Sequence, residues 1–136
     1  MIFLKVVVAS TEEQESHIEE LVAQMYTGIF PMYFSDEEIE ELHEQAVLRP
    51  RTEDSAYNGT LKEAFQIISS LQALIALLEN LNDSDRKIYR SMFERNTRIL
   101  NEYGYFFPFS FDQFIAATYR EGMFSQYVKP ANQFLI

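Results

Sequence analysis

The sequence predicts a mainly α-helical single domain, a bundle of about five helices with an N-terminal β-strand in a minor sheet. The first observation is a capping motif, Ser or Thr followed three residues later by Glu or Gln, which recurs four times. The second is that apolar side chains follow these motifs at helical spacing. The third is that 136 residues, 47% hydrophobic and 15% aromatic, suffice to build one core.

Residues 2–8 are predicted to form the strand. They are apolar on both faces and Lys5 is their only charge, a pattern typical of a strand that is buried on both sides. An unpaired strand this apolar would aggregate, so it requires a partner. The candidates are the C-terminal tail, the Val47–Leu48 stretch and the same strand of a second subunit. A homodimer is therefore one of the expected assemblies.

The first two helices carry most of the acidic residues. The first is predicted to begin at Ser10 or Thr11 and to end at Gly28 and Pro31. Its apolar stripe consists of Ile18, Leu21, Val22, Met25 and Tyr26, and most of the remaining surface is glutamate.

The second helix is predicted to begin at Ser35, which forms a capping box with Glu38. Phe34 and Ile39 have the spacing of a hydrophobic staple. The helix dipole favours the acidic first turn. A mostly polar loop, broken by Pro50, is expected to follow over residues 47–58.

The third helix, about residues 61–81, follows a capping box of Thr60 and Glu63. It is apolar over more than half of its circumference, so we expect it at the centre of the bundle. An antiparallel fourth helix is predicted over about residues 85–103. Asn96 lies on its apolar face, where it could set a register or be a satisfied core polar group. The opposite face is basic, with Arg86, Lys87, Arg90, Arg95 and Arg98.

An aromatic run follows Gly104 and leads to a fifth helix, which Ser110 and Gln113 cap and which ends near residue 121. The run could line a small-molecule pocket, form an oligomer interface, or lie over the core with its rings buried. The residues considered for the pocket are Tyr105, Phe106, Phe107 and Phe109. The tail, residues 122–136, is apolar enough to pack, and residues 127–128 and 134–136 are expected to form short strands.

The charge is divided unevenly along the chain. Residues 1–48 contain eleven acids and one base, so this acidic N-terminal part carries the whole formal net charge of −10. Residues 49–136 balance ten acids with ten bases, and this charge-neutral part includes the helical core (60–121) and the tail (122–136). Such a field repels nucleic acid and anionic membranes and attracts basic partners. We therefore expect neither nucleic-acid nor membrane binding.

The leading functional hypothesis is a non-enzymatic interaction or regulatory protein. It would present Glu19, Glu20, Glu40 and Glu41 to a basic protein partner. Two alternatives are that this acidic face is merely solvated, or that it pairs with the basic face of the fourth helix at about 0–1 kcal/mol per exposed pair. The rival hypothesis is a small-molecule-binding protein or enzyme that uses the aromatic run as a pocket wall.

The sequence predicts no metal site, cofactor or catalytic set. The chain has no cysteine, which excludes disulfides and thiolate chemistry. Glu40 and His43 have a metal-ligand spacing, and Glu13 with His17 could complete a two-helix site. The stronger interpretation is that His43 is a core histidine with one hydrogen bond.

Two sequence features favour a cytoplasmic protein. The apolar N-terminal stretch is short and has no basic residues before it, unlike a signal peptide. The longest uncharged run, residues 64–78, is too short and too polar to span a bilayer.

The segments Val8–Glu15 and Ile29–Ile39 resemble a family of small, soluble, uncharacterised bacterial proteins, a domain of unknown function of Gram-positive bacteria. The resemblance covers mainly the first 50 residues. It implies a cytoplasmic bacterial setting and supplies no catalytic residue or ligand.

Overall fold

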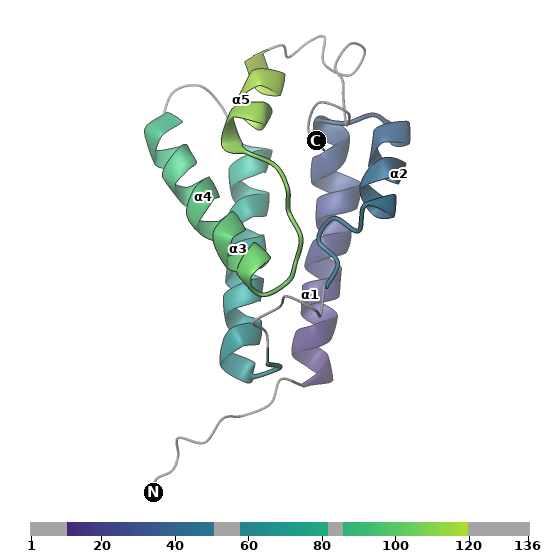
Figure 1. Cartoon of the computed structure of the whole chain (residues 1–136), viewed down its shortest axis with the longest axis vertical. Coiled ribbons are helices and arrows are strands. Elements are labelled where there is room, and N and C mark those ends of the chain that lie inside the picture. Colours follow the sequence, from purple (N-terminus) through teal and green to yellow (C-terminus); the bar gives the residue numbers. More distant parts are fainter. Residues whose placement is uncertain (1–10, 51–57, 82–85, 120–136) are drawn as a thin grey trace, which may run out of the picture.

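The protein is mainly helical, as predicted (Figure 1). The computed structural model describes residues 11–50, 58–81 and 86–119. The predicted strand at residues 2–8 and the two short strands of the tail lie outside these ranges. Within them no β-strand occurs, although Pro50 and Tyr105 form an isolated antiparallel bridge. The elements are α1 (Glu12–Gln24), η1 (Met25–Ile29), η2 (Phe30–Met32), α2 (Asp36–Glu44), α3 (Leu61–Glu79), α4 (Arg86–Glu102) and α5 (Phe111–Tyr119).

The third helix, α3, lies between α1 and α4 (Figure 1), which confirms the prediction that it is central. Its buried residues are Ala64, Ile67, Ile68, Ser70, Leu71, Leu74, Ile75, Leu77 and Leu78. By length and composition alone, α3 could also cross a membrane, and half of its apolar window is buried inside the protein. The core helix of a soluble protein meets the same criterion, so this property is weak evidence for a membrane span.

Capping boxes begin three of the helices, as the sequence predicted. Thr11, Ser35 and Thr60 each accept a hydrogen bond from the backbone three residues on, and Gln14, Glu38 and Glu63 bond back to them. These bonds satisfy amides that a helix start would otherwise leave unpaired. At the fourth motif, the Ser110 amide donates to Gln113 Oε1 at 2.8 Å.

The α-helix ends at Gln24, but the chain remains helical to Met32, close to the end predicted at Gly28 and Pro31. It continues through one π-helical turn, η1, and one 3-10 turn, η2, which contains Pro31. The hydrophobic environment accounts for this continuation, because four of the eight residues in these two turns lie in the core. Met25, Tyr26, Ile29 and Phe30 are all buried.

Residues 45–50 form a turn that buries two apolar side chains, whereas the sequence suggested the start of a polar loop. Val47 and Leu48 are 0% and 1% exposed. The Val47 amide donates to Leu42 O at 3.0 Å and the Leu48 amide to Phe106 O at 2.6 Å. Both amides are therefore already bonded, and this stretch, one of the three candidate partners of residues 2–8, does not offer them a free strand edge.

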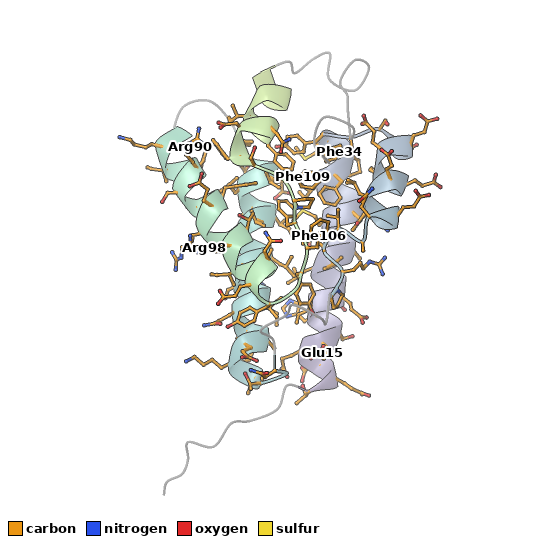
Figure 2. All side chains as sticks on the ribbon, in the orientation of Figure 1. Glu15, Phe34, Arg90, Arg98, Phe106 and Phe109 are labelled. Carbon is orange, nitrogen blue, oxygen red and sulfur yellow. The ribbon has the colours of Figure 1, made fainter. Side chains whose placement is uncertain are left out.

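A cluster of aromatic rings joins the aromatic run to η2 and α5. Phe107, Phe109 and Phe114 are buried and contact one another, with ring centroids 5.0–6.2 Å apart. Phe34 and Phe109 lie close together between the α5 side of the bundle and the α2 side (Figure 2). This cluster therefore fixes α5 and the aromatic run on the core.

Candidate functional site

The first candidate site is the acidic edge, defined as Glu19 and Glu20 of α1 with Glu40 and Glu41 of α2. Glu41 is half-buried and the other three are exposed. None of the four forms an ion pair with another residue in the described ranges. Glu19 lines the same cavity as His43, which lies one turn after Glu40. Glu20 instead lines a groove between α1 and α3.

The basic face of α4 does not neutralise the acidic edge. Arg90 and Arg98 project from one side of the molecule, and α2 lies on the opposite side (Figure 2). The Arg90 guanidinium makes two hydrogen bonds to the Asp112 carboxylate, at 2.6 and 3.3 Å, and lies 3.8 Å from Glu94. The hydrogen bond to Asp112 raises the pKa of Arg90. Arg90 therefore does not form the ion pair with the acidic edge that was considered from the sequence.

The second candidate site is a cavity of about 530 Å³ between α1 and the turn at residues 45–50, here called the Tyr26 cavity. Apolar side chains and tyrosine rings form much of its wall. Charged groups lie at its rim, with carboxylates from α1 and a guanidinium from the turn. The lining residues are Glu15, Ile18, Glu19, Val22, Ala23, Tyr26, Thr27, His43, Leu48, Arg49, Pro50 and Tyr105.

Tyr26, in η1, bonds to the turn that forms one wall of this cavity. Its hydroxyl donates a 2.7 Å hydrogen bond to the Val47 carbonyl. Burial raises the pKa of Tyr26 to about 12, although the Arg49 guanidinium acts in the opposite direction. The His43 ring stacks on the Tyr26 ring, with centroids 4.0 Å apart and an interplanar angle of 15°.

His43 is exposed, so the prediction that it is a core histidine is wrong. Its ring stacks on Tyr26, yet the residue as a whole remains open to solvent. An Arg49 Nη atom lies 3.5 Å from His43 Nδ1. The histidine therefore belongs to the rim of the Tyr26 cavity, next to the one basic residue of the turn.

The backbone next to the cavity is strained. Ala46 and Leu48 both have φ of 61°, a region that costs L-residues about 1–2 kcal/mol each. Such strain persists only where surrounding contacts impose it, and it is often found at functional sites. Here the hydrogen bonds to Val47 and Leu48 impose it.

The aromatic run supplies one residue to this cavity. Tyr105 lines it, whereas Phe107 and Phe109 are buried in the core and Phe106 is half-buried. The run therefore lies mostly over the core, and a pocket walled by all four rings stays a prediction.

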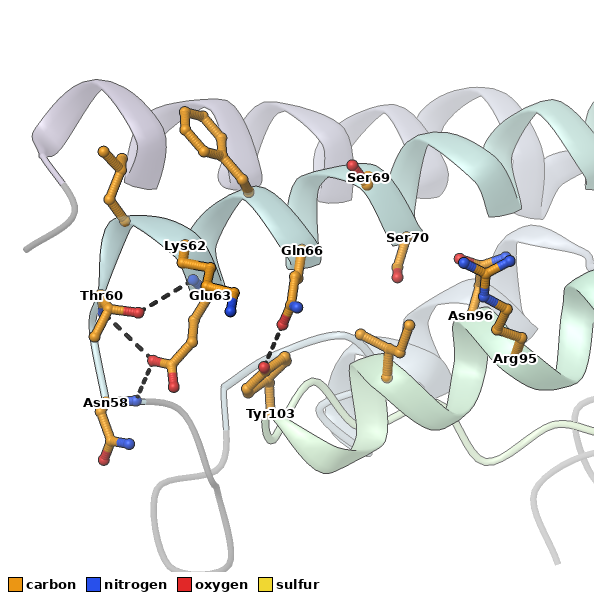
Figure 3. A pocket seen from close by; sticks show the side chains of 13 residues that line it. Asn58, Thr60, Lys62, Glu63, Gln66, Ser69, Ser70, Arg95, Asn96 and Tyr103 are labelled. Carbon is orange, nitrogen blue, oxygen red and sulfur yellow. Dashed lines mark hydrogen bonds between the residues drawn. The ribbon is translucent and has the colours of Figure 1, made fainter. Parts of the chain in front are cut away.

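The third site is an open cavity of about 1100 Å³ between α3 and α4 (Figure 3). Its walls combine apolar and polar side chains, and the Tyr103 hydroxyl donates a hydrogen bond to Gln66 Oε1 there. Asn96 lines it and donates to the Met92 carbonyl of its own helix at 2.7 Å. The expectation that Asn96 is a core residue is therefore wrong, since it is only half-buried.

The four residues considered for a metal do not converge. Glu13 and His17 line the groove between α1 and α3, whereas His43 lines the Tyr26 cavity. In the described part of the chain, no group of three or more His, Asp or Glu residues is placed to hold a metal ion.

Replacing Tyr26 with Phe should lower the free energy of unfolding by about 1 kcal/mol, because the buried Val47 carbonyl loses its donor. Between pH 10 and about 12 the unfolded chain releases the Tyr26 proton while the native chain retains it. The contribution of Tyr26 is therefore complete below pH 10 and declines as the pH approaches 12. Urea unfolding of both proteins across this range measures it. A difference that does not change with pH would contradict the assignment.

These observations define a helical bundle that carries its acidic and basic surfaces on opposite sides. The chain belongs to a family of unknown function, DUF5365, whose model matches residues 4–119. It is 38% identical over 114 residues to the uncharacterised protein YhcU of Bacillus subtilis strain 168. The aligned region covers 84% of this chain and 86% of that protein. No solved structure matches. The resemblance stated from the sequence is confirmed, and the match extends well beyond the first 50 residues.

Proposed function

We propose that this protein is a non-enzymatic interaction or regulatory module of the cytoplasm that binds a basic protein partner through its acidic edge. The observation that carries the proposal is the separation of charge. Glu19 and Glu40 are exposed without an ion-pair partner among the described residues, and Arg90 is engaged by Asp112 on α5. The negative field of α1 and α2 is thus available to an incoming cation.

Two features make this edge suitable for recognition. The capping boxes at Thr11 and Ser35 fix the starts of both helices, so the carboxylates are carried on ordered backbone. The ring stack of Tyr26 and His43 connects η1, which directly continues α1, to α2. A partner therefore meets a preorganised array of acids, which reduces the ordering cost of binding.

The chemistry of the partner follows from that of the edge. A segment rich in Lys and Arg would gain attraction from several carboxylates at once. Exposed charges of this kind act mainly on the association rate and on specificity, and salt screens them. Binding should therefore weaken as the ionic strength rises.

Charge reversal tests the proposal. The quadruple variant Glu19→Lys, Glu20→Lys, Glu40→Lys and Glu41→Lys should lose capture of a basic protein from a Gram-positive bacterial lysate. The double variant Glu19→Lys with Glu40→Lys should lose most of it, and it leaves the groove residue Glu20 unchanged. Cross-linking followed by mass spectrometry identifies and quantifies the captured protein.

A matched control has the same change in net charge at other exposed acids. Glu79→Lys with Glu102→Lys replaces acids on α3 and α4, and this variant should capture the partner as the wild type does. Circular dichroism melting must show that all variants remain folded. Equal capture by the acidic-edge double variant and the wild type would refute the proposal.

The Tyr26 cavity supports a second candidate function, the binding of a small molecule. Its volume of about 530 Å³ falls within the range of small-molecule pockets, which is roughly 300–1,000 Å³. Tyr26 and Tyr105 offer aromatic surface, and Arg49 and Glu19 supply charges of opposite sign to the lining. A ligand with an apolar body and both an anionic and a cationic group fits this distribution.

A metabolite screen by thermal unfolding tests this candidate, because a ligand that binds only the native state raises the melting temperature. Zwitterionic aromatic compounds should stabilise the wild type, and Arg49→Ala should abolish the shift. The control Arg98→Ala removes an exposed arginine from α4 and should retain the ligand-induced rise in melting temperature. If no compound stabilises the wild type, this candidate loses its support.

A further inference from the structure

Phe65 is 51% exposed although it belongs to the central helix. With Ile68 it forms the apolar wall of a groove of about 670 Å³ between α3 and the first half of α1. The opposite wall is acidic, with Glu12, Glu13 and Glu20. This groove therefore suits an occupant that is apolar on one side and carries positive charge on the other.

Residues 1–10 of the chain have this chemistry. They include Ile2, Phe3, Leu4, Val6, Val7 and Val8, and Lys5 is their only charged residue. A segment this apolar is costly to leave in water. Burying it against Phe65 would cover both surfaces, and the lysine would face the glutamates of α1.

The point of attachment also favours this segment. Residue 10 is followed by Thr11, the N-cap of α1, and the next two residues line the groove. Ten extended residues span at most about 33–36 Å. The 13 residues of α1 span about 20 Å, so a chain that reverses direction at Thr11 can follow the whole groove. Covalent attachment at its mouth gives the segment a high effective concentration there.

The family match distinguishes the two apolar ends of the chain. The family model begins at residue 4 and ends at residue 119. It therefore includes most of the N-terminal segment and excludes the tail. An occupant that belongs to the shared fold is expected within the matched range.

We propose that residues 1–10 bind within their own chain in the groove between α1 and α3, where they cover Phe65 and direct Lys5 toward the acidic wall. The groove is then an internal docking site. Of the four residues of the acidic edge, Glu20 lines this groove, and Glu19, Glu40 and Glu41 do not. The proposal does not depend on the acidic-edge function.

Fluorescence in the full chain tests whether the groove is covered. The chain has no tryptophan, so Phe65→Trp introduces a single reporter. Its emission should lie at a shorter wavelength, with acrylamide quenching several-fold weaker, than that of the control Ile88→Trp. Ile88 is 60% exposed on α4. Without a bound segment, Phe65 and Ile88 are similarly exposed, at 51% and 60%. Equal emission and quenching in the two variants would therefore overturn the proposal.

Disulfide formation identifies the occupant, and the absence of native cysteine makes the test clean. Ser16→Cys, on the groove wall, is combined in turn with Val6→Cys, Val7→Cys and Val8→Cys. At least one pair should oxidise rapidly within a monomer, because a disulfide requires Cα atoms within about 7 Å. The same three variants combined with Ile88→Cys should not. Disulfide-linked dimers from the Ser16→Cys pairs would show that a second copy of the chain occupies the groove. If none of the three pairs forms a disulfide, residues 1–10 do not occupy it. Either result overturns the proposal.

Discussion

Phe114→Ala is expected to lower the free energy of unfolding by about 3–5 kcal/mol, the usual cost of removing a fully buried phenylalanine. The side chain is 0% exposed. Its ring connects α5 to the residues just after η2, to α4 and to the aromatic run, so no single neighbour can move to fill the cavity. The surrounding rings, with centroids 4.9–6.3 Å away, are those of Tyr33, Phe34, Phe93, Phe107 and Phe109.

Urea unfolding followed by circular dichroism measures this loss. Phe114→Leu keeps much of the volume and should be distinctly less destabilising. Ile88→Ala is the control at an exposed position, where substitutions usually change stability by at most about 0.5 kcal/mol. A loss below about 1 kcal/mol for Phe114→Ala would show that the aromatic cluster does not hold α5 on the bundle.

The elements that the sequence predicted well are those that depend on neighbours along the chain. The boxes of Ser35 with Glu38 and Thr60 with Glu63 join residues three positions apart, so they are visible in the sequence before any fold is known. The central position of α3 was also predictable. A helix that is apolar over more than half of its surface can be satisfied only between other helices.

The elements that were missed depend on contacts between distant segments. The turn at residues 45–50 needs the Tyr26 hydroxyl, which donates to the Val47 carbonyl, and the Phe106 carbonyl, which accepts from the Leu48 amide. Neither contact leaves a periodic pattern in the sequence. The signs of φ at Ala46 and Leu48 were equally invisible, because the positions lack the Gly or Asn that usually marks this conformation.

For the candidate sites too, the sequence predicted what depends on composition and missed what depends on contacts between distant segments. Charge counting predicted an acidic surface on the first two helices, since net charge is a property of composition. It could not predict that Glu19 and His43 would border one cavity while Glu20 faces α3. Arg49 was missed entirely, because its role comes from the turn that places it beside His43.

The aromatic run illustrates how one composition permits several outcomes. Aromatic side chains favour cores, interfaces and pockets alike. What selects the core for Phe107 is a polar residue, Asn101 at the end of α4. The Phe107 amide donates to Asn101 Oδ1 at 2.8 Å, and Asn101 Nδ2 donates to the Phe107 carbonyl at 3.1 Å. This amide side chain thereby replaces the strand pairing that an extended segment would otherwise need.

Asn101→Ala is therefore expected to lower the free energy of unfolding by about 2 kcal/mol, because both backbone groups of Phe107 lose their partner. Asn96→Ala is the matched control on the same helix, since its amide bonds only the Met92 carbonyl, and it should cost less than about 1 kcal/mol. Hydrogen exchange gives an independent readout at the Leu48 amide, which donates to Phe106 O. Exchange there should accelerate in Asn101→Ala and remain unchanged in Asn96→Ala. Equal destabilisation by the two substitutions would contradict this role of Asn101. The packing of the Phe107 ring would then be the main reason that the aromatic run lies on the core.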